Sequence, residues 1–122
     1  MPIGSATLMR QVGGRGYFAR VRLEVTLSNP GHRFEIDDTV TDRWFMPAVE
    51  VGVNYAWLRL LSEGQKPPSV SVRVLELATM TVDTSEMQVV YVSALALCDG
   101  LSMSLREPIV IDFVTRRVSF SI

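Results

Sequence analysis

The sequence predicts an α+β domain in which two helices pack on one face of a four- to five-stranded sheet. Three observations predict this class: segments that alternate apolar and polar residues, two longer segments with apolar residues at helical spacing, and clusters of Gly and Pro between them. A chain of 122 residues is long enough to bury one core, so we treat residues 1–122 as a single domain.

The N-terminal part predicts a hairpin and a third strand. Residues 7–12 predict a strand, and the glycines of "GGRG" at 13–16 predict a turn because glycine tolerates positive φ. Residues 17–28 then alternate, so that one face of a long strand carries Val21, Leu23, Val25 and Leu27. After the turn residues "NPGH" at 29–32, residues 33–37 alternate again.

The first helix is predicted to begin near Pro47 and to stop at Gly64, with "KPP" at 66–68 preventing its continuation. Its apolar stripe consists of Val49, Val53, Ala56 and Leu60. Gly52 costs about 1 kcal/mol inside a helix, so we expect the helix to approach the sheet closely there.

Residues 69–79 predict the next strand, and a second helix is expected over about 84–98, ending at Gly100. Asp83 and Glu86 have the spacing of a capping box and are interpreted as structural residues that begin this helix. Residues 107–114 predict the last clear strand. The alternation slips near 115–117, which predicts a bulge or a turn before an extra terminal strand.

Composition indicates the cellular compartment in which the protein works and the kinds of partner that it lacks. The net charge of −1 gives no overall field that would recruit nucleic acid. No apolar segment is long enough to cross a membrane, and the N-terminus lacks the pattern of a signal peptide. The single cysteine, Cys98, is expected to be a small buried hydrophobic residue. These features predict a cytoplasmic protein without a membrane partner.

The residues that support catalysis are missing. His32 is the only histidine, and no Cys or His stands at ligand spacing, so we predict neither a metal site nor a cofactor. Ser85 has no His or Lys close to it in sequence that could activate it as a nucleophile. "GGRG" lacks the Gly-Lys-Ser/Thr ending of a phosphate-binding loop. The sequence therefore predicts that the protein is not an enzyme.

Several segments together resemble the fourth domain of translation elongation factor G. They are "RQVGGRGYFARVRLEV", "GHRFEI", "FMPAVEVGVNYA", "SVRVLELATMTVDTSEM" and "LREPIVIDFV", and they follow one another in the family's order over about residues 10–115. The resemblance implies a mixed sheet of the type found in a small-subunit ribosomal protein, with a left-handed β-α-β crossover, which is rare among proteins.

The resemblance also implies a function. In the family this domain enters the decoding site of the small ribosomal subunit, and its tip consists of the loops that correspond to residues 13–17 and 79–84. We therefore predict a ribosome- or RNA-binding, translation-associated module. Arginine suits phosphate and an aromatic ring suits base stacking, so the candidate RNA-binding residues are Arg10, Arg15, Tyr17, Arg20, Arg22 and Met80.

Three of these positions depart from the family pattern. Met80 and Arg20 stand where the family has histidines, and Tyr17 stands where it has a glutamine. Met80 and Tyr17 thus replace polar groups suited to RNA by more apolar side chains.

These departures, with an apolar content of 48%, support an alternative. The chain would then be a protein-interaction domain that forms a homo-oligomer through an exposed apolar face or through the C-terminal edge strand "VSFSI". No Gly-x-x-x-x-Gly-Lys-Ser/Thr motif of a GTPase occurs in the sequence. Met1 and the strand-like ending favour a free-standing protein, with an excised domain as the other interpretation.

Overall fold

The computed structural model describes residues 3–12, 15–27, 33–37, 39–40, 43–80, 84–112 and 117–119. Three strands come first: β1 (Ile3–Val12), β2 (Arg15–Leu27) and β3 (Arg33–Ile36). Helix α1 (Met46–Ser62), strand β4 (Val70–Thr79) and helix α2 (Glu86–Leu101) follow. Two short strands, β5 (Val110–Asp112) and β6 (Arg117–Ser119), complete the described chain. This order confirms the α+β class.

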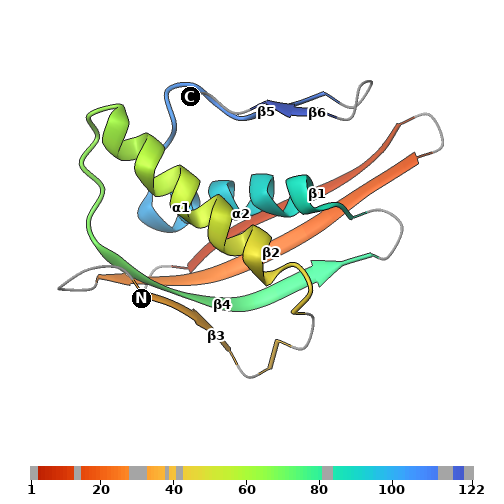
Figure 1. Ribbon diagram of the computed structural model, residues 1–122, viewed down its shortest axis with the longest axis horizontal. Coiled ribbons are helices and arrows are strands. Elements are labelled where there is room, and N and C mark those ends of the chain that lie inside the picture. Colours follow the sequence, from red (N-terminus) through yellow and green to blue (C-terminus); the bar gives the residue numbers. More distant parts are fainter. Residues whose placement is uncertain are drawn as a thin grey trace.

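Four strands form one mixed sheet in the order β1-β2-β4-β3 (Figure 1). β1 pairs antiparallel with β2, and β2 pairs antiparallel with β4. β3 runs parallel to β4, so α1 is the crossover of a β-α-β unit. The left hand of this crossover, which the family resemblance implies, stays a prediction.

The C-terminal strand differs from the expectation of a fifth strand in the main sheet. β5 pairs antiparallel with β6 in a separate two-stranded sheet, in which Val110 lies opposite Ser119. β6 contacts α2, and Figure 1 shows this pair beyond the helices, on the side away from the main sheet. The slip in alternation near 115–117 therefore lies where the chain enters β6, a strand that pairs with β5.

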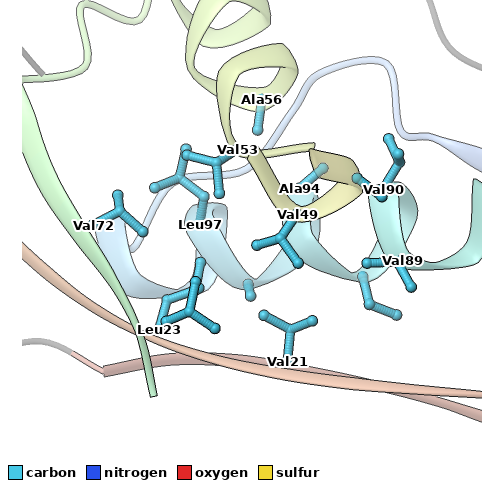
Figure 2. Close-up of a cluster of buried hydrophobic side chains, with 14 of the residues drawn as sticks. Val21, Leu23, Val49, Val53, Ala56, Val72, Val89, Val90, Ala94 and Leu97 are labelled. Carbon is cyan, nitrogen blue, oxygen red and sulfur yellow. The ribbon is translucent and has the colours of Figure 1, made fainter. Parts of the chain in front are cut away.

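Both helices lie on one face of the sheet, as predicted (Figure 1). Figure 2 shows side chains from α1, α2 and the sheet meeting between the layers. The alternation of β2 determines its inner face, because Val21, Leu23 and Val25 are at most 2% exposed. Leu27 was assigned to the same face, but it is 79% exposed because it is the last residue of the strand.

A bulge changes the alternation of β4. Arg22 of β2 lies opposite Glu76, whereas the next residue, Leu23, lies opposite Val74, so Leu75 is an extra residue in β4. Val72 and Val74 are buried before the bulge, and Leu77 is buried after it. The extra residue therefore keeps apolar side chains on the inner face along the whole strand.

Gly52 marks a close approach to the other helix and not to the sheet. A Cβ atom on Gly52 would lie 2.4 Å from the carbonyl oxygen of Val90 and 2.8 Å from Cβ of Ser93, both in α2. A side chain at this position would force the two helices apart, which explains a glycine in the middle of α1.

The helix termini are partly as expected. Pro47 lies in the first turn of α1, and Gly64 follows its end with φ +82°. α2, in contrast, continues through Gly100 to Leu101, and Ser102 adopts the left-handed conformation with φ 55°. Gly100 is required for packing, because a Cβ there would lie 2.7 Å from Cγ2 of Val25.

The capping box of α2 is formed by Ser85 and Gln88, which corrects the prediction for Asp83 and Glu86. The Ser85 hydroxyl accepts a hydrogen bond from the Gln88 N–H, and the Gln88 side chain accepts one from the Ser85 N–H. Glu86 is the first helical residue, where its carboxylate interacts favourably with the helix dipole but does not cap the helix. Asp83 lies outside the described residues.

Candidate functional site

One end of the sheet brings together the two segments that the sequence assigned to a binding tip. The β1–β2 hairpin ends there, and β4 ends beside β2, with Thr79 opposite Ala19. A shallow hollow of about 470 Å³ at this end is lined by Met9, Arg10, Gln11, Gly16, Tyr17, Phe18 and Met80. We call these seven residues the tip.

Thr84 connects the two segments of the tip. Its Oγ1 accepts a hydrogen bond from the Met80 N–H at 2.8 Å and donates one to the Phe18 carbonyl oxygen at 2.6 Å. The Thr84 N–H also donates to the Met80 carbonyl oxygen at 3.1 Å. The start of the β4–α2 connection is therefore fixed against β2. Sequence reasoning missed this role, although a hydroxyl residue next to a helix start is a common signal for such a contact.

Alternation divides the predicted arginines between the two faces of the sheet. Arg10 lies opposite Tyr17, on the face that carries the helices. Arg20 lies opposite Thr7 and Arg22 lies opposite Ser5, both on the outer face. Arg10 and the guanidinium of Arg20, which lies by Phe18, therefore approach the tip from two sides, whereas Arg22 lies nearer the other end of the β1–β2 pair, so the predicted residues do not form a single cluster.

Arg20 is held against its neighbours on the outer face. Its Nε donates to Oγ1 of Thr7 at 3.4 Å, and its guanidinium carbon lies 5.8 Å from the centre of the Phe18 ring. The side chain is nevertheless exposed, so its charge stays accessible to a partner.

Tyr17 cannot serve as the stacking platform that the sequence suggested. Its side chain is only 6% exposed because residue 17 points toward the helix face with the core residues of β2. Stacking on a base needs an open ring face, which a buried side chain does not offer. The side chain of Arg15 lies outside the described residues, although its backbone forms the start of β2.

The tip exposes two apolar side chains, of which the sequence predicted only one. Met80 is 53% exposed and Met9 is 75% exposed. Met9 was not among the predicted residues, but its position opposite Phe18 places it on the outer face of β1. Both methionines line the hollow of the tip, and methionine is a side chain that adapts to different contact surfaces.

The described part of the chain contains no group of three or more His, Cys, Asp or Glu residues that could hold a metal ion. His32 lies outside the described residues. Cys98 is buried, as predicted, and this burial, with a smaller effect from the negative charge of Glu63, raises the pKa of its thiol to about 11. A thiol with this pKa is a poor nucleophile at neutral pH.

Neither of the two described helices combines the length and the apolar character that crossing a lipid bilayer requires.

Comparisons with known proteins identify elongation factor G proteins as relatives of this chain. No family model matches the chain. Elongation factor G of Aquifex pyrophilus is 32% identical in an alignment of 114 positions that covers 88% of this chain and 16% of that protein. Elongation factor G of Thermotoga maritima is 34% identical in an alignment of 110 positions that covers 83% of this chain and 16% of that protein. The chain thus spans about one sixth of the length of these relatives.

A solved structure supports the fold. The crystal structure of a protein from Thermus thermophilus superposes with a TM-score of 0.69 over 83% of this chain and 16% of that chain. The sequence identity is 20%, so this comparison establishes the arrangement of helices and strands alone.

Proposed function

We propose that this chain, a homologue of a domain-sized segment of elongation factor G, is a translation-associated module that binds the ribosome through its tip. The homology covers 83–88% of the chain, which supports a common fold for most of its strands and helices. The observation that carries the proposal is the contact of Thr84 with Phe18 and Met80, because it joins the two segments that form the tip in the family.

The chemistry of the tip suits a phosphate-rich partner with some apolar surface. Arg10 of the tip and Arg20, whose guanidinium lies by Phe18, are exposed and offer forked donors to phosphate oxygens, and Arg22 adds a third exposed guanidinium farther along β2. Met9 and Met80 add exposed apolar contact area around the hollow. In this proposal the arginines supply most of the affinity and the methionines supply contact area. The protein then works in the cytoplasm without a catalytic step of its own.

Co-sedimentation with small ribosomal subunits tests the proposal. We expect binding at low salt that weakens steeply as salt increases, because phosphate contacts release counterions. Arg20→Glu and Arg10→Glu should each reduce binding severalfold. Arg106→Glu is the matched control, since it makes the same charge change beyond the C-terminal end of α2, a helix of about 24 Å that begins beside the tip.

Two results would overturn the proposal. One is the absence of binding at low salt. The other is an equal loss of binding in the Arg106→Glu variant, which would mean that net charge and not the tip determines the association.

Self-association remains the second candidate function. The specific observation in its favour is an apolar groove beside α1, which lies away from the tip. The predicted C-terminal edge strand "VSFSI" falls largely outside the described residues.

A further inference from the structure

A groove of about 360 Å³ lies between α1 and the β3–β4 side of the sheet. Its walls are mainly apolar and include Phe34, Val53, Trp57, Leu58, Val70 and Val72. The groove exists because α2 lies against β1 and β2, whereas β3 is a four-residue strand at the sheet edge. The inner side chains of β3, Phe34 and Ile36, are therefore only partly buried.

An exposed apolar ridge runs along α1 at the rim of this groove, and Leu58 belongs to both the ridge and the groove wall. Val51 and Leu58 are 56% and 59% exposed, and they are seven residues apart, so they lie on one line of the helix. Leu61, which is 47% exposed, lies one turn beyond Leu58. The same helix thus contributes a wall of the groove and a ridge that could fill a similar groove.

Opposite charges mark the two ends of the groove. Arg33 lies opposite Ser71 at the start of β4, and Nε1 of Trp57 donates to the carbonyl oxygen of Pro68 at 2.8 Å. The C-terminal half of α1 and Arg33 are therefore at the same end. Glu50 lies seven residues before Trp57, which is about 10 Å along the helix. Both charged residues line the groove and are exposed, and within the described part of the chain neither makes an ion pair.

We propose that this groove is a dimerisation surface that takes α1 of a second copy of the chain. A two-fold axis across the middle of the groove makes the two α1 helices antiparallel. Arg33 of each copy then meets Glu50 of the other, and Leu58 of each copy enters the other's groove. This self-complementarity of charge and shape identifies a second copy as the occupant. Dimerisation is independent of ribosome binding, because none of these residues belongs to the tip.

Sedimentation equilibrium across the micromolar range tests the proposal with the full chain. We expect a monomer–dimer equilibrium in the unchanged protein. Arg33→Glu and Glu50→Arg should each weaken the dimer about tenfold, because each change places two like-charge pairs in the symmetric interface. The double variant R33E/E50R should restore the original affinity, since it recreates both pairs with the charges exchanged.

Two further variants separate this surface from general apolar association. Leu58→Asp should remove the dimer, whereas Ile3→Asp should leave it unchanged, because Ile3 is 47% exposed but lies on β1, at the opposite edge of the sheet from β3. Circular dichroism checks that each variant is folded. A monomer at every concentration overturns the proposal, as does a dimer that is insensitive to Leu58→Asp. Failure of the double variant to recover overturns the two-fold pairing.

Discussion

Replacing Gly52 by alanine tests the close approach of the two helices. Helix propensity alone predicts that this change in the middle of α1 stabilises the protein by about 1 kcal/mol. The structure predicts the opposite sign. The added Cβ would lie 2.4 Å from the Val90 carbonyl oxygen and 2.8 Å from Cβ of Ser93. Nonbonded carbon atoms prefer separations of roughly 3.5–4.0 Å, so the helices must separate by about 1 Å.

The size of the effect follows from two opposing contributions. Overpacking of a core costs about 1–3 kcal/mol, and the upper part of this range applies because the obstructing atom belongs to a helix backbone that cannot rotate away. Subtracting the helix-propensity gain of about 1 kcal/mol leaves a net destabilisation of about 2 kcal/mol.

Urea unfolding followed by circular dichroism measures this difference. The midpoint should decrease while the slope stays unchanged. Asn54→Ala is the matched control, because residue 54 is exposed in the same helix and gains helix propensity without a contact to α2. If Gly52→Ala were as stable as the unchanged protein, or more stable, the two helices would not be in this close contact.

Three further predictions follow from individual side chains. Ser85→Ala should destabilise the protein by about 1 kcal/mol in the same urea assay, whereas Asp83→Ala should have a much smaller effect, because Ser85 is the capping residue. Hydrogen bonds from the backbone N–H of Arg106, and then of Glu107, lower the pKa of Glu63 below its ordinary value of 4.5. The unfolded state therefore takes up a proton first, so stability should fall as pH decreases below about 4.5, and Glu63→Gln should make this fall smaller without abolishing it, because the pKa of Asp37 is also lowered, chiefly by the backbone N–H of Thr39. Cys98 should react with a thiol reagent roughly 100-fold more slowly in the folded than in the unfolded protein, because its pKa rises from 9.0 to about 11; an equal rate would show that it is not buried.

Local patterns predicted most of the secondary structure. Alternation identified the inner face of β2 because a strand with one buried face must place apolar residues at every second position. Pro47 and Gly64 identified the ends of α1 because their backbone preferences act within a single turn. These signals depend on neighbours in sequence, so the sequence alone was sufficient to interpret them.

Features that depend on distant neighbours were not predictable in the same way. Asp83 and Glu86 overlap with Ser85 and Gln88, and both pairs have the spacing of a capping box, so local rules could not choose between them. Gly52 indicated a close contact, but only the packing of α1 on α2 identifies the partner. Tyr17 has the residue type of a stacking platform, yet the face of the sheet on which it lies decides its exposure. The RNA-binding role of the candidate site residues stays a prediction.

The bulge at Leu75 has a consequence for chain length. Because Glu76 and Val74 already lie opposite the consecutive residues Arg22 and Leu23, deleting Leu75 alone would leave every cross-strand partner in place and straighten the ladder. Deleting one residue elsewhere in β4 would turn the following side chains to the wrong surface. Homologous proteins that differ by one residue in this strand should therefore have gained or lost it at this position.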